Sequence, residues 1–177
     1  MSQRYRIHER EYPYFITSTI VYWLPVFSKN EYFQVLEDSL VYCSQKKGLN
    51  IHAYVLMPNH FHLICSQENG ALSRVIADLK GFTSRKIIKM MHTDGRDVWI
   101  RAMRSAGGKQ ADYKFWQDEF HPEQVYSQKF FDQKLKYIHE NPLRAGYVDD
   151  PSDWKHSSAK FYYQEVDPEI AIAPLTW

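Results

Sequence analysis

The sequence contains little cysteine and no long apolar run. Cys43 and Cys65 are the only cysteines among the 177 residues, and they lack CxxC spacing. We therefore expect two buried free thiols in a reducing compartment rather than a disulfide framework. No apolar stretch approaches the roughly 20 residues of a membrane-spanning helix, and the first ten residues are charged rather than signal-like. These absences predict a soluble, intracellular protein with no membrane partner.

Internal repeats, low-complexity tracts and linkers are also absent. We therefore expect a single domain over residues 1–177, in which residues 146–177 form an irregular C-terminal tail. Aromatic residues, in contrast, are abundant, with 13 Tyr, 10 Phe and 5 Trp. Their rings suit either core packing or stacking on nucleic-acid bases. For Trp116, packing is favoured over stacking.

The net charge of +1 hides an uneven distribution. Residues 74–114 contain ten Lys or Arg and four Asp, so this segment carries +6 and the remainder −5. A basic segment in a nearly neutral protein is typical of binding to a polyanion. The same composition also fits a solvated helix face followed by a loop, and charge alone does not decide between the two.

Hydrophobic periodicity predicts the helices and strands and their order. Aromatic and β-branched residues favour strands at 14–22, 50–57, 60–65 and 124–126. The helical period predicts helices at 30–47, 72–91 and 128–141. Ser127 should cap the last helix and Pro142 should end it. Residues 93–114 lack periodicity and are expected to form a mobile loop, with a short strand at 98–101.

This order of elements matches the split βαβ, or ferredoxin-like, arrangement. We therefore predict an α+β fold in which helices cover one face of an antiparallel sheet. The other face is left free for a ligand or a further helix, and we place the C-terminal helix at 128–141 near it.

Two histidines stand in the apolar stretch "YVLMPNHFHLI", residues 54–64. Side chains alternate across a strand, so His60 and His62 point to one sheet face and Phe61 to the other. Two imidazoles on one face can hold a divalent ion, but such a site needs a third ligand and an open position. The alternative is a pair of hydrogen-bonded, inert histidines.

The helix at 128–141 offers groups that could complete such a site. Tyr137 and Asn141 lie one turn apart, beside the apolar stripe of this helix. Taken singly, Tyr137 also fits a packing role, and Asn141 fits a helix cap before Pro142. His139 is expected on the surface.

Three stretches together resemble a known family. "YVLMPNHFHLI" resembles the signature strand of the HUH nucleases, as it occurs in single-tyrosine transposases. "LKYIHENPLRAGYV", residues 135–148, resembles the tyrosine-bearing helix of the REP-associated tyrosine transposases, and "DWKHSS", residues 153–158, looks like the block that follows it there. The resemblance covers about residues 12–162.

The resemblance implies a metal site and a nucleophile. His60 and His62 would bind the metal, Mg²⁺ or Mn²⁺, and Tyr137 would be the nucleophile. Asn141 would be the third ligand, at a position where many relatives carry glutamine. The ligand types alone suit Mn²⁺ or Zn²⁺ at least as well, so the metal stays open.

The resemblance also implies a reaction and a substrate. A metal-dependent endonuclease and strand transferase would cut single-stranded DNA, beside a hairpin or repeat, through a covalent 5′-phosphotyrosine. Residues expected to meet the nucleic acid are Arg74, Lys80, Arg85, Lys86, Arg101 and Arg104. The resemblance also implies that the protein is located in a prokaryotic cytoplasm, in association with the nucleoid. Related transposases form dimers, so the choice between a monomer and a homodimer stays open.

The main alternative is a binding module of ferredoxin-like fold that holds single-stranded nucleic acid without cutting it. That alternative explains the basic segment and the aromatic residues. It leaves the pairing of the "HFH" strand with a tyrosine-bearing helix unexplained.

Overall fold

The computed structural model describes residues 12–67, 69–109, 111–118 and 121–175. The strands are β1 (Tyr14–Thr19), β2 (Leu49–Leu56), β3 (His60–Gln67) and β4 (Glu123–Gln124). The α-helices are α1 (Asn30–Lys47), α2 (Leu72–Thr93), α3 (Asp97–Gly107), α4 (Gln128–His139), α5 (Asn141–Arg144) and α6 (Ala159–Gln164). Short 3-10 turns span Val21–Trp23 and Pro151–Asp153.

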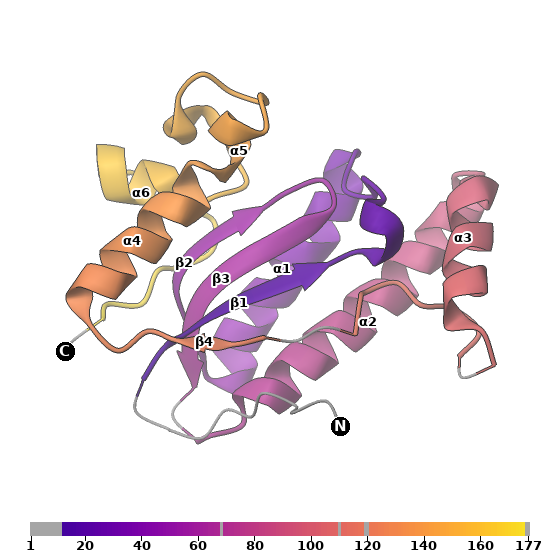
Figure 1. Cartoon of the computed structure of the whole chain (residues 1–177), viewed down its shortest axis with the longest axis horizontal. Coiled ribbons are helices and arrows are strands. Elements are labelled where there is room, and N and C mark those ends of the chain that lie inside the picture. The colour runs from indigo at the N-terminus through magenta and orange to yellow at the C-terminus, as the bar shows by residue number, and fades with distance from the viewer. Residues whose placement is uncertain (1–11, 68, 110, 119–120, 176–177) are drawn as a thin grey trace.

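The four strands form one antiparallel sheet in the order β2-β3-β1-β4. Helices α1 and α2 lie on one side of this sheet, and α4 with α6 lies on the other (Figure 1). This is the predicted α+β, ferredoxin-like arrangement, with the tyrosine-bearing helix on the second face. The fold prediction is confirmed.

Strand β3 sends its side chains alternately into two separate cores. Phe61, Leu63 and Cys65 enter the larger core, under α1 and α2. Ile64 enters a smaller core under α4, together with Phe131 of that helix. The period of two therefore puts His60 and His62 on the α4 face, as strand geometry predicts.

Strand β1 is shorter than expected. The sequence predicts a strand to residue 22, but β1 ends at Thr19 and a 3-10 turn follows. Tyr22 and Trp23 both have a φ of 55°, in the left-handed region, so the backbone cannot continue as a strand.

The predicted loop with a strand at 98–101 is wrong, because residues 97–107 form helix α3. Ile100 and Met103, one helical turn apart, are buried and hold the helix against the larger core. Asp97 in the first turn is favourable for the helix dipole. The buried pair spans only one helical turn, and Gly107 and Gly108 follow it, so the helical period is not evident in the sequence.

The last predicted helix is divided. Ser127 caps α4 as predicted, since its Oγ accepts a hydrogen bond from Phe130 N. Helix α4 then ends at His139, and Pro142 lies in the first turn of α5 rather than stopping α4. A proline fits there because first-turn amides have no helical acceptor.

The tail is more ordered than predicted. Residues 146–177 include a 3-10 turn and α6, and Ser157 bridges to Val55 on the edge strand β2. Both cysteines are free and buried, and Trp116 packs on Phe27 and Phe61, as expected. None of the helices in the described ranges is long and apolar enough to cross a membrane.

Candidate active site

A cavity of about 670 Å³ opens where β1, β3, α4 and α5 meet. Its walls combine rings, imidazoles and charged groups. They comprise Phe15, Thr17, Trp23, His60, His62, Glu123, Lys134, Tyr137, Asn141, Arg144 and Ala145. The four residues that the sequence predicts for the metal and the nucleophile therefore share one cavity.

The two histidines lie next to each other, with their Nδ1 atoms already occupied. Their ring centroids are 4.8 Å apart. Nδ1 of His62 is 2.8 Å from Thr17 Oγ1, and Nδ1 of His60 is 2.6 Å from Asn59 Oδ1. Such partners fix the orientation of an imidazole and leave Nε2 as the atom able to bind a metal.

Burial keeps both imidazoles neutral. It lowers the pKa of His60 to about 4. It also lowers the pKa of His62 to about 3, with the charges of His60, Lys134 and Arg144 acting in the same direction. Because only the neutral imidazole has a free lone pair, these pKa values favour metal binding at neutral pH.

Tyr137 lines the cavity from α4, and its ring contacts His62 and Phe15. Its ring centroid lies 5.3 Å from that of His62 and 5.9 Å from that of Phe15. Phe15 in turn stacks on His62, with centroids 5.2 Å apart. Tyr137 is 43% exposed, so a large substrate can reach it.

Asn141 begins α5, one position beyond the break after α4. Its side chain hydrogen-bonds His60, which opposes part of the burial effect on that imidazole. The amide therefore lies at the histidine pair, where a third ligand would be needed. Groups of three or more His, Cys, Asp or Glu able to hold a metal are absent from the described residues, so this site would consist of two imidazoles and an amide.

Two cations in the cavity were not predicted from the sequence. The Arg144 guanidinium lies 4.7 Å from the centroid of the Tyr137 ring, and its Nη2 donates to Tyr137 O at 2.8 Å. Lys134 Nζ lies 4.2 Å from the Phe15 ring and 2.8 Å from Glu123 Oε2. A sequence signal exists, because positions 134, 137, 141 and 144 recur every three or four residues, on one helical face.

The six basic residues predicted to bind nucleic acid lie elsewhere, on α2 and α3. Arg74, Arg85, Lys86, Arg101 and Arg104 are exposed. Lys80 instead is half-buried, donates to Gln117 O at 3.2 Å, and has a pKa lowered by burial. The structure thus leaves five of the six available to a ligand, away from the cavity.

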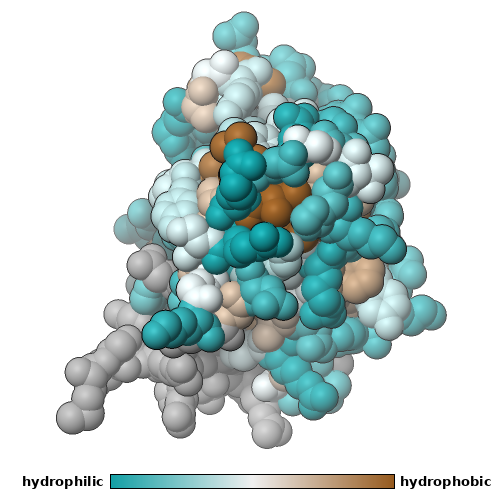
Figure 2. Space-filling model, turned by 90° about the vertical axis from the view of Figure 1, so that its right-hand side faces the viewer, coloured by the Kyte–Doolittle hydropathy of each residue, from teal (hydrophilic) through white to brown (hydrophobic). Residues whose placement is uncertain are grey.

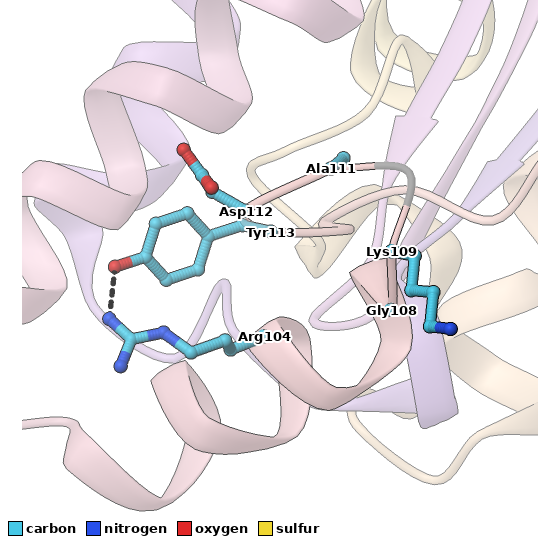
Figure 3. A pocket seen from close by; sticks show the side chains of 6 residues that line it. All are labelled: Arg104, Gly108, Lys109, Ala111, Asp112 and Tyr113. Carbon is cyan, nitrogen blue, oxygen red and sulfur yellow. Dashed lines mark hydrogen bonds between the residues drawn. The ribbon is translucent and has the colours of Figure 1, made fainter.

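The α3 end of the molecule is mostly hydrophilic (Figure 2). A pocket at this end is lined by Arg104, Gly108, Lys109, Ala111, Asp112 and Tyr113. Within it, Arg104 faces Tyr113, and Arg104 Nη2 donates to the Tyr113 hydroxyl at 2.7 Å (Figure 3). The guanidinium also lies 5.2 Å from the centroid of that ring.

His139 is buried, which contradicts its predicted place on the surface. Its side chain is 0% exposed, and its Nε2 lies 2.8 Å from Ser158 Oγ. Ser158 belongs to the tail and also hydrogen-bonds β2 at Tyr54. The helix face that looked exposed in the sequence is covered because the tail returns over it.

Comparison with known proteins shows the family of this chain. The family model described as "Transposase IS200 like" matches residues 13–141. The match spans most of the chain, and the chain belongs to this family of transposases.

Two similar proteins are REP-associated tyrosine transposases. The REP-associated tyrosine transposase of Escherichia coli K12 is 24% identical over 145 residues, which cover 82% of this chain and 72% of that protein. A solved structure of a REP-associated tyrosine transposase bound to a REP hairpin matches with a TM-score of 0.68 at 20% identity, covering 100% of this chain and 94% of that one. The predicted resemblance is confirmed, and at this identity the structural match shows a shared fold.

Proposed function

We propose that this transposase is a metal-dependent endonuclease and strand transferase of single-stranded DNA, acting through a covalent bond to Tyr137. One observation carries the proposal. A single cavity collects His60 and His62 from β3, Tyr137 from α4 and Asn141 from α5. A binding module would not require an exposed tyrosine in one cavity with two neutral imidazoles.

The donor set fits a divalent ion, and we propose Mg²⁺ or Mn²⁺ because the family resemblance implies these metals. Nε2 of both histidines is oriented by the partners of Nδ1, and the Asn141 amide lies against His60. A bound divalent ion would neutralise charge on the non-bridging oxygens of the scissile phosphate. Lys134 and Arg144 add fixed positive charge around the same phosphate.

In the proposed step, the hydroxyl oxygen of Tyr137 attacks phosphorus and the bond from phosphorus to the 3′ oxygen breaks. The tyrosine proton is lost to solvent, and the departing 3′ oxygen takes up a proton to become a free hydroxyl. The 5′ phosphate stays on Tyr137 as a phosphodiester. Attack by another 3′ hydroxyl reverses the step, so the bond energy is kept and strands are exchanged without ATP.

The proposed substrate is single-stranded DNA beside a hairpin. The relative of known structure was solved with a REP hairpin, and the exposed cations on α2 and α3 suit a phosphate backbone. We place the unpaired strand at the cavity and the hairpin stem along the basic helices.

Adduct formation tests the proposal directly. Hairpin DNA with a labelled single-stranded flank, incubated with Mn²⁺ or Mg²⁺, should give a protein–DNA band that survives denaturing electrophoresis. Tyr137→Phe should abolish the band, because the attacking oxygen is gone. Tyr126→Phe, at another exposed tyrosine outside the cavity, is the matched control and should retain it.

The histidine variants separate cleavage from binding. His60→Ala and His62→Ala should lose cleavage and keep part of the DNA affinity, since the basic helices are intact. An adduct that persists in Tyr137→Phe would refute the nucleophile. DNA binding with no cleavage in Mg²⁺, Mn²⁺ or Zn²⁺ would instead support the alternative, a binding module.

A further inference from the structure

The turn between β1 and α1 exposes two adjacent aromatic side chains. Tyr22 is 60% exposed and Trp23 58%. Large rings are usually buried at least in part, since each removes considerable apolar area from water. Burial in the protein core therefore does not account for these two rings.

The backbone at these residues is also strained. Both have a φ of 55°, a region that costs free energy for residues with a β-carbon and is usual only for glycine. Hydrogen bonds from Val21 N to Phe115 O and from Ile20 N to Asn59 O, each 2.9 Å, hold the turn in place. Strain that the surroundings maintain is concentrated at functional sites.

The strained turn is joined to the candidate metal site through Asn59. Asn59 Nδ2 donates to Trp23 O at 3.5 Å, while Asn59 Oδ1 lies 2.6 Å from His60 Nδ1. The Trp23 ring lines the cavity, edge-to-face with His60 at a centroid distance of 6.0 Å. The Asn59 side chain thus contacts both the His60 imidazole and the backbone of Trp23.

We propose that the exposed Trp23 ring forms an aromatic platform on which an unpaired DNA base beside the scissile phosphate stacks. The inference rests on the proposed function for its substrate. The charges favour this occupant, because Lys134 and Arg144 in the same cavity attract a phosphate. A flat exposed ring next to that position suits the attached base, and stacking of this kind tolerates any base.

The test compares two 12-nucleotide chains: oligo-dT, and an abasic deoxyribose-phosphate chain of equal length and charge. Affinities are measured by fluorescence anisotropy in the Tyr137→Phe background, where no adduct forms. Oligo-dT should bind more tightly than the abasic chain. Trp23→Ala should weaken oligo-dT binding by about 5-fold to about 150-fold, the range expected for one stacked base, and leave the abasic chain unaffected.

Trp23→Gly distinguishes the platform from a structural role. Glycine accepts the positive φ without strain, so this variant should melt at the same or a higher temperature and still lose oligo-dT affinity. Tyr42→Ala, at a ring that is 55% exposed on α1 and outside the cavity, is the matched control and should change neither.

The outcomes separate this inference from the proposed function. An equal loss of affinity for both chains, or a lower melting temperature in Trp23→Gly, would overturn the platform. If the wild-type protein forms no adduct but Trp23→Ala selectively weakens oligo-dT, the platform stands and the nuclease proposal fails. If the adduct forms and the two chains bind Trp23→Ala with the wild-type affinities, the platform alone is refuted.

Discussion

The cavity end and the α2–α3 end of the molecule both carry cations, but they hold them differently. At the cavity, Lys134 pairs with Glu123 and Arg144 with Glu140, at 2.8 and 3.2 Å. Both cations also lie over aromatic rings. Along α2 and α3, Lys86 and Arg104 also lie over aromatic rings, and Arg104 donates to the Tyr113 hydroxyl. The described residues, however, form no ion pair with Arg85, Lys86, Arg101 or Arg104.

The difference separates two ways of using positive charge. A cation held by a carboxylate, a carbonyl and a ring has one position, and such fixed charge can stabilise a transition state without reorganising. An exposed cation outside any ion pair adapts to any phosphate, and contributes attraction that salt screens. We therefore expect catalysis to depend on the cavity end and general affinity on the other.

Among the cations, the largest expected effect is at Arg144. Arg144→Ala should slow single-turnover adduct formation by roughly 100-fold to 1,000-fold, the usual cost of removing one fixed electrostatic group. DNA affinity should change much less. Quenched-flow or gel time courses at saturating DNA measure the rate.

Lys136→Ala is the matched control for Arg144. Lys136 also pairs with Glu140, at 3.7 Å, but it is exposed and does not line the cavity. Its removal should leave the rate within about 2-fold of wild type, as for other exposed ion pairs of small energy. An equal loss of rate in Arg144→Ala and Lys136→Ala would mean that the shared pairing with Glu140, and not the positive charge in the cavity, determines the rate of adduct formation.

A smaller effect, on DNA affinity, is expected at the α2–α3 end of the molecule. The double variant Arg85→Ala, Arg101→Ala should weaken hairpin binding at low salt. It should also make the slope of log affinity against log salt shallower by about 2, one for each phosphate that the protein no longer neutralises. The rate at saturating DNA should not change. Isothermal titration or anisotropy at several salt concentrations provides the slope.

Lys46→Ala controls for net charge, because Lys46 is exposed on α1 and lies outside residues 74–114. Lys46→Ala should leave the salt slope unchanged. If its slope instead becomes shallower by about 1, as expected for each residue removed in the double variant, total charge rather than the α2–α3 surface sets the affinity.

Local periodicity was sufficient to predict the sheet and the two histidines. The alternation of β3 requires only neighbouring residues, so the face occupied by His60 and His62 could be read directly from the sequence. The pairing with Tyr137 needed the resemblance to a family, because about seventy-five residues separate the two elements and periodicity cannot say which elements meet.

Tertiary packing explains what sequence analysis missed. His139 is polar and lies near the end of a helix, so only the returning tail, with Ser158 against it, makes it a core residue. Helix α3 depends on two buried residues that a loop-like composition conceals. Trp23 was not distinguished from the other aromatic residues, because its exposure and positive φ appear only in the folded turn.

The smallest expected effect is at Lys80, which lies within the basic segment 74–114 but which we do not expect to bind DNA. Its ammonium group is held by Gln117 O, and burial lowers its pKa, so the charged form is already disfavoured in the fold. Lys80→Met keeps the length of the side chain and removes the charge. The salt slope of hairpin binding should therefore match that of the wild-type protein. The free energy of unfolding should stay within about 1 kcal/mol of the wild-type value or rise, because replacing a buried charge with an apolar side chain is often neutral or stabilising. Urea denaturation and the same anisotropy titration give both values. A slope that becomes shallower by about 1 would place Lys80 among the residues that bind phosphate and extend the adaptable surface into the packed side of α2.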